Sequence, residues 1–174
     1  MRARITAVAL LVGLLFSYGS LALAQTREFS PTVAVEGQVD TPRTYTLADV
    51  QALPAESMDP AALDGSQMAG HAYRGVRLYD LLQTAGPRFD RARNNDSLRF
   101  YAVVTGTDGY QAVIAWGELD PGFEGKAVLL AYEQDGQPLG PPDGMARLVV
   151  PGDQRGGRYV SNVRTIALQR APDA

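Results

Sequence analysis

The sequence predicts a mixed α/β domain in which strands dominate and short helices lie at the periphery. Several short segments alternate apolar and polar residues, which is typical of half-buried strands. Segments 47–53 and 78–85 instead carry apolar residues at helical spacing. Cysteine is absent from the 174 residues, so a packed core rather than disulfides has to stabilise the domain. A chain of this size can bury roughly two thirds of its surface on folding.

The N-terminal segment has the layout of a secretory signal peptide. Two arginines precede an apolar run over 5–16, and Ala-Leu-Ala at 22–24 is a small-residue cleavage site. We expect cleavage after Ala24 and a periplasmic or secreted product. The alternative, a membrane anchor, is disfavoured because the apolar run is too short to span a bilayer. Residues 25–174 are then expected to form one domain with its core over about 33–168, without a membrane span.

The charge balance bears on the partner. The whole chain has a formal net charge of −3, and removal of Arg2 and Arg4 leaves 14 basic against 19 acidic residues, or −5. An acidic surface repels phosphate backbones, so nucleic acid is not an expected partner. The charge does not select any other ligand.

The first elements follow from periodicity and from the residues that end it. Valines alternate over 32–39 and predict a strand, with a possible bulge at Gly37 and an end before Pro42. Thr46 is close to a capping box and precedes a short helix over 47–53.

The next segment, 54–70, is rich in Ala, Asp, Ser and Gly without a period, so an irregular surface excursion is expected. A second helix follows over 78–85 with an apolar stripe, and Gly86-Pro87 ends it.

The second half of the chain reads mainly as strands. Two alternating runs around a turn predict a hairpin over 98–104 and 110–116. Glu118 and Asp120 are better explained as favourable first-turn acids of a short helix than as a catalytic acid pair. Three further strands are expected over 127–132, 147–150 and 163–168, the first of them ending in a tight turn at 135–136.

A glycine- and arginine-rich loop at 151–158 is the strongest chemical candidate. Glycines let the backbone approach a ligand closely, and arginines can bind phosphate or carboxylate through paired N–H groups. The candidate ligand-binding residues are Arg147, Arg155, Gly156, Gly157 and Arg158. The alternative is that the glycines only shape a connection while the arginines form ion pairs with Asp143 and Asp153.

Four motifs in this chain resemble those of the oxidoreductase molybdopterin-binding domain family, which includes sulfite oxidase and plant-type nitrate reductase. They are YRGVRLYDLL at 73–82, DGY at 108–110, DGQPL at 135–139 and RLVVPG at 147–152. Their order and spacing agree with the family over roughly 33–168. The resemblance implies the sulfite-oxidase-type molybdopterin-binding fold and makes molybdopterin a possible cofactor.

Two departures from the family pattern concern the cofactor. The family enzymes use one cysteine thiolate upstream of the helix at 78–85 as a metal ligand, and this chain offers only Ser66, Met68 and His71 there. The enzymes typically carry a lysine and a tryptophan where this chain has Ser161-Asn162. We therefore expect no metal site, and no resident cofactor is favoured.

Three weaker candidates remain. His71 is the only histidine and is a candidate general base or lone ligand, although a packing or surface role is the commoner one. Asp108 and Tyr110 would present a carboxylate and a phenol beside the cofactor side of the family fold, or would simply form a hairpin turn.

Two functions remain open from the sequence. In the first, the chain binds molybdopterin or another small anionic ligand through the glycine- and arginine-rich loop. In the second, it is a non-catalytic periplasmic module that kept the fold, lost the cofactor and recognises a small ligand or a protein. Without the metal-ligand cysteine we do not expect an autonomous enzyme, and whether any reaction occurs is left open.

Overall fold

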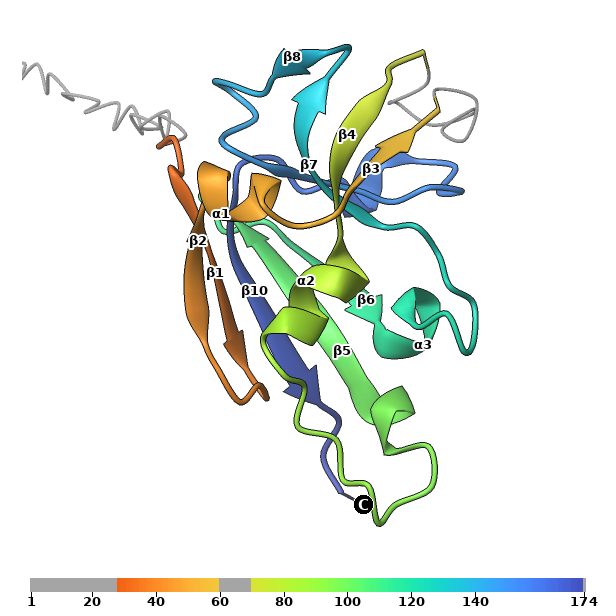
Figure 1. Ribbon diagram of the computed structural model, residues 1–174. Coiled ribbons are helices and arrows are strands. Elements are labelled where there is room, and N and C mark those ends of the chain that lie inside the picture. The colour runs from red at the N-terminus through yellow and green to blue at the C-terminus, as the bar shows by residue number, and fades with distance from the viewer. Residues whose placement is uncertain (1–27, 60–69, 174) are drawn as a thin grey trace, which may run out of the picture.

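Two β-sheets form the body of the molecule in the computed structural model, which describes residues 28–59 and 70–173 (Figure 1). The first sheet has five strands in the order β2-β1-β10-β5-β6. Only β1 and β10 pair in parallel, and the other neighbours are antiparallel. The strands are β1 (Thr32–Gly37), β2 (Arg43–Thr46), β5 (Phe100–Gly106), β6 (Gln111–Ala115) and β10 (Val163–Arg170).

The second sheet has the order β3-β4-β7-β8, and a further strand, β9, also pairs with β7. All of its pairings are antiparallel. The strands are β3 (Ala55–Met58), β4 (Tyr73–Arg77), β7 (Leu129–Gln134), β8 (Gln137–Pro138) and β9 (Arg147–Val149).

The helices are short and lie around the sheets, as Figure 1 shows for α1, α2 and α3. They are α1 (Leu47–Gln51), α2 (Leu78–Thr84) and α3 (Trp116–Leu119), with 3₁₀ turns η2 (Asp96–Arg99) and η3 (Gly156–Arg158). The predicted strand-rich mixed α/β class is therefore confirmed.

The start of α1 shows how the sequence specifies a local boundary. The Thr46 hydroxyl accepts a hydrogen bond from the Asp49 amide, and the Asp49 carboxylate accepts one from the Thr46 amide. This reciprocal capping box satisfies two backbone donors that a helix start otherwise leaves unpaired. The expected cap at Thr46 is confirmed.

An aromatic cluster at the edge of the core joins α2, α3 and β5. The Phe89 ring meets the Phe100 ring edge to face at 4.9 Å and the Trp116 ring at 4.8 Å, while Tyr79 lies 5.4 Å from Trp116. Such edge-to-face contacts stabilise beyond the area that they bury. Trp116 is fully buried, so the cluster holds α3 in place against the first sheet.

One glycine of the motif at 73–82 has a packing role. Gly75 lies where the register between β4 and β7 shifts. A Cβ at this position would overlap the backbone of Leu130 in β7. The motif thus includes glycine because the two strands approach too closely for any side chain.

The structure corrects three predictions. Residues 55–58 are strand β3 rather than part of an irregular excursion, because their backbone pairs with β4. Residues 43–46 and 73–77, for which no strand was expected, are β2 and β4. Leu98 lies in η2 and is exposed instead of beginning a hairpin strand, since β5 starts at Phe100.

Some predictions fall outside the part of the chain that the structure describes. The signal peptide at 1–24 does so, as do Ser66 and Met68. Across residues 28–59 and 70–173, no helix has the length and apolar character needed to cross a membrane.

Candidate functional site

The loop from β9 to β10 carries four of the eight predicted site residues, namely Arg155, Gly156, Gly157 and Arg158. Arg158 in η3 makes the main charged contacts of this loop. The Arg158 Nε and Nη2 atoms donate to the Asp153 carboxylate at 2.8 and 2.5 Å. Its Nη1 atom donates to both oxygens of Glu118 in α3, at 3.1 and 2.9 Å. One guanidinium thus bonds two carboxylates from two elements.

Burial makes this arrangement stronger than an ordinary surface pair. The side chains of Arg158, Glu118 and Asp153 are 29%, 23% and 16% exposed. Lys126 approaches the same Glu118 carboxylate at 3.3 Å. Charge-assisted hydrogen bonds gain strength when water is partly excluded, and fork-shaped contacts fix the geometry as well.

The contacts shift the pKa values of all three groups. The pKa of Asp153 is lowered, chiefly by its hydrogen bonds from Arg158. Burial pushes the pKa of Glu118 upward, but hydrogen bonds from Arg158 and from the Ala115 amide outweigh it and leave the pKa lowered. The pKa of Arg158 is raised, first by Asp153 and then by Glu118. All three groups are therefore charged at neutral pH.

Arg147 on β9 is held by a different set of groups. Its Nη1 atom lies 3.1 Å from the Asp143 carboxylate, and its guanidinium carbon lies 5.8 Å from the centre of the Tyr73 ring. The Arg147 side chain is only 12% exposed. The guanidinium is therefore packed across β7 against Tyr73 of β4 instead of reaching into open solvent.

The other predicted residues of this loop are more accessible to solvent. Arg155 and Gly157 are exposed, and Gly156 is half-buried. Arg155 makes no ion pair with the residues that the structure describes. Of the three arginines predicted as ligand-binding residues, Arg155 alone has its charge available at the surface.

A small cleft brings together three of the predicted residues, namely Asp108, Tyr110 and Gly156. Its volume is about 200 Å³, and Tyr159 and Ser161 complete its lining. None of the three predicted arginines lines it. Most ligand pockets measure about 300–1,000 Å³, so this cleft suits only a small polar group.

Hydrogen bonds fix both walls of this cleft. The Tyr110 hydroxyl donates to the Gly157 carbonyl at 2.5 Å, which connects the turn between β5 and β6 to η3. The Asp108 carboxylate accepts from the Tyr110 amide at 3.0 Å, within its own turn. Tyr159 donates to the Val150 carbonyl at 2.6 Å. The turn chemistry expected for 108–110 is present, and it also places the phenol against the loop.

His71 lies apart from this cleft, at the second sheet. Its Nδ1 atom is 2.7 Å from the Asp135 carboxylate and 3.1 Å from the side-chain nitrogen, Nε2, of Gln134. The His71 hydrogen bond is the main cause of the lowered pKa of Asp135. No group of three or more metal-ligating side chains occurs around it or elsewhere in 28–59 and 70–173.

Asn162 is an important residue that the sequence did not mark as structural. It is buried and has φ of 52°, a left-handed conformation that asparagine tolerates better than most residues. Its side chain accepts from the Ser30 amide at 2.8 Å and donates to the Glu28 carbonyl at 2.7 Å and the Thr107 hydroxyl at 2.8 Å. The Asn162 side chain thus connects three segments of this chain.

The comparisons with known proteins agree with the geometry of the fold. The family described as oxidoreductase molybdopterin binding domain matches residues 22–174. No curated protein matches the chain. Among solved structures, the sulfane dehydrogenase SoxCD from Paracoccus pantotrophus superposes with a TM-score of 0.58 at 23% identity, over 79% of this chain and 38% of that chain. At that identity the likeness concerns the fold, and this chain spans less than half of the SoxCD chain.

Proposed function

The chain belongs to the oxidoreductase molybdopterin-binding domain family, and from this premise we propose that it is a periplasmic recognition module that does not hold molybdopterin as the family enzymes do. The predicted sulfite-oxidase-type fold is confirmed by the family match and the structural neighbour. The proposal concerns what this fold does here. Export rests on the signal peptide that the sequence predicts.

The proposal rests on the hydrogen bonds that Arg158 makes to Asp153 and Glu118. A phosphate group bound by this guanidinium would have to displace Asp153 and Glu118, which donate no hydrogen bonds and repel an anion. Asp153 would then lose its arginine partner, and Glu118 would keep only Lys126 and the Ala115 amide, so breaking these partly buried contacts is unfavourable. Arg158 is therefore better suited to stabilising the loop than to binding an exchangeable anion.

The other donors agree with this interpretation. Arg147 is packed between Asp143 and Tyr73. The small cleft beside Gly156 is about 200 Å³. The chain has no cysteine to act as the thiolate ligand that the family enzymes use. The residues present thus do not fit the cofactor in the family manner, and we assign the chain no redox step.

One observation favours a second candidate, an anion-binding function at the same loop. Arg155 is exposed without an ion pair among the described residues, and Gly157, two residues further along, leaves room for a ligand to approach its backbone closely. A single exposed arginine gives weak attraction in water. This candidate requires a ligand that Arg155 and backbone N–H groups bind together.

The test is to produce the full chain in a host that makes molybdopterin and to purify it from the periplasm. Molybdenum and the fluorescence of oxidised pterin are then measured per protein, with a cysteine-containing family enzyme from the same host as the positive control. We expect far less than one equivalent of either in folded protein. One equivalent of pterin would overturn the proposal, and its loss in Arg155→Gln would establish the second candidate.

A matched variant tests the physical reason. Glu118→Gln with Asp153→Asn removes both negative charges around Arg158 while keeping side-chain size. If these carboxylates prevent Arg158 from binding anions, inorganic pyrophosphate should bind this double variant more tightly than the wild type. Equal binding to both proteins would contradict the explanation.

A further inference from the structure

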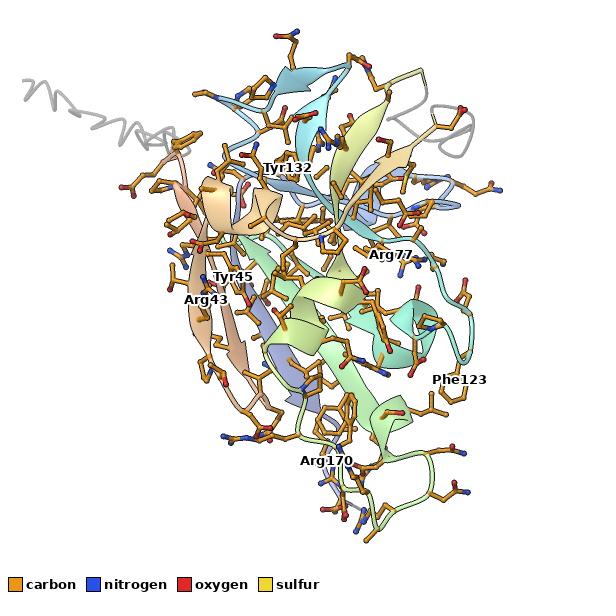
Figure 2. The ribbon with its side chains drawn as sticks, in the orientation of Figure 1. Arg43, Tyr45, Arg77, Phe123, Tyr132 and Arg170 are labelled. Carbon is orange, nitrogen blue, oxygen red and sulfur yellow. The ribbon has the colours of Figure 1, made fainter. Side chains whose placement is uncertain are left out.

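A second cluster of arginines lies where β10 ends, away from the candidate site. Figure 2 shows Arg170 at the end of the molecule opposite the second sheet, which carries Tyr132. Three arginines converge here on one carboxylate. Arg93 and Arg99 each donate from Nη1 to the Asp173 Oδ1 atom at 2.8 Å, and Arg170 Nη1 lies 3.5 Å from Oδ2.

The three arginines are distributed unequally over the two oxygens of the Asp173 carboxylate. Both close contacts fall on one of its oxygens, whereas the other oxygen receives only the longer approach of Arg170. The Arg170 Nε atom is buried and has no hydrogen-bond partner among the described residues. A planar carboxylate with two oxygens is thus a poor match for three guanidinium groups.

The rest of the cluster holds Arg170 in position. Its Nη2 atom donates to Asp96 Oδ1 at 2.9 Å, and that carboxylate, 2% exposed, also accepts the Asp90 amide at 2.8 Å. Arg99 Nη2 donates to the carbonyls of Ala171 and Pro172. Arg99 and Arg170 are therefore pre-organised by contacts that do not involve Asp173, which lowers the entropic cost of binding a ligand.

The cluster is also accessible. The Asp173 carboxylate is 58% exposed, and the side chain of Arg93 is 51% exposed. Arg170 also lines a cavity of about 440 Å³, whose lining includes Arg91, Asp40, Asp90 and Asp96 but neither Arg93 nor Arg99. Access for a ligand rests instead on the exposure of Arg93 and Asp173, which solvent reaches without unfolding of the surrounding segment.

We propose that Arg93, Arg99 and Arg170 form an exchangeable site for a tetrahedral oxyanion, such as phosphate or sulfate, which binds in competition with Asp173. Such an anion presents oxygens in several directions and satisfies three guanidinium groups at once. Asp173 occupies the site as an internal substitute. The site is independent of the function proposed above, because it shares no residue with the loop at 151–158.

Isothermal titration calorimetry with inorganic phosphate and sulfate tests the site, with chloride keeping the ionic strength constant. Four full-length proteins are compared: the wild type, Asp173→Asn, Arg93→Gln and, as a matched loss of one exposed arginine elsewhere, Arg164→Gln. We expect about fivefold tighter binding in Asp173→Asn, because the competing charge is gone, and about fivefold weaker binding in Arg93→Gln, with Arg164→Gln unchanged.

Two results would overturn the proposal. One is phosphate affinity in Asp173→Asn no higher than in the wild type, and the other is an equal loss of affinity in Arg93→Gln and Arg164→Gln. The Arg170 Nε–H resonance, followed by NMR, should shift on addition of phosphate, and its failure to move would also contradict the site. Phenyl phosphate is titrated as well, to distinguish two kinds of ligand. Binding as tight as that of inorganic phosphate indicates that the site takes a phosphate monoester on a larger molecule, and weaker binding indicates that it takes the free ion.

Discussion

Replacement of Asn162 by glycine should destabilise the fold far more than a typical surface substitution. Glycine keeps the left-handed backbone conformation at φ of 52° but removes the three side-chain hydrogen bonds to Ser30, Glu28 and Thr107. Each such bond contributes about 1 kcal/mol, so the free energy of unfolding should fall by about 3 kcal/mol. For a domain of this size that corresponds to a Tm lower by roughly 6–12 °C.

Urea unfolding followed by tryptophan fluorescence measures this loss directly. Trp116 is the only tryptophan and is fully buried, so its emission reports the opening of the core. Asn162→Ala provides the comparison, since it loses the same hydrogen bonds and adds about 1–2 kcal/mol of left-handed backbone strain. A loss below about 1 kcal/mol in Asn162→Gly would refute the idea that this side chain connects three segments.

Three further predictions concern the candidate site. Arg155→Ala should change the free energy of unfolding by less than about 0.5 kcal/mol in urea titrations, because exposed side chains outside any network contribute little. The pKa values of Asp153 and Glu118 are lowered in the folded state, so the unfolded chain binds more protons near pH 4. Their stabilisation should be complete above about pH 5 and be lost as pH falls through the folded pKa values, seen as a falling urea midpoint. Tyr110→Phe should cost less than about 1 kcal/mol in global stability but speed amide hydrogen exchange in η3, and unchanged exchange would show that the phenol does not anchor the loop.

The elements with strong local signals could be predicted from the sequence. The capping residues at Thr46 and the apolar stripe of α2 act within one turn of helix, so neighbouring residues specify them. The alternation in β5 and β6 gives their hairpin in the same way. Such signals need no knowledge of the rest of the fold.

The missed strands depend on distant partners. β2 has only Tyr45 buried, and β3 has only Met58 buried, so neither shows an apolar period. Both become strands because β1 and β4 offer backbone hydrogen-bonding groups beside them. Pairing of this kind is a property of the tertiary structure.

The candidate site likewise has features that the local sequence indicates and features that depend on distant residues. The sequence identified the loop at 151–158 from its glycines and arginines, and it raised Asp153 as a partner for an arginine. It did not reveal that Glu118, 40 residues from Arg158, bonds the same guanidinium. Nor did it reveal that Asn162 is buried, since a left-handed asparagine becomes recognisable only when its neighbours in space are known.

The coupling energy between Arg158 and Glu118 tests most directly whether this arginine is committed to the interior of the protein. Arg158→Gln, Glu118→Gln and the double variant form a double-mutant cycle, with urea unfolding as the measurement. The pair is partly buried and doubly hydrogen-bonded, so we expect a coupling of about 1.5–2 kcal/mol, above the 0.2–1 kcal/mol that exposed pairs typically give. A coupling below about 0.3 kcal/mol would contradict the account and leave Arg158 free to bind an anionic ligand.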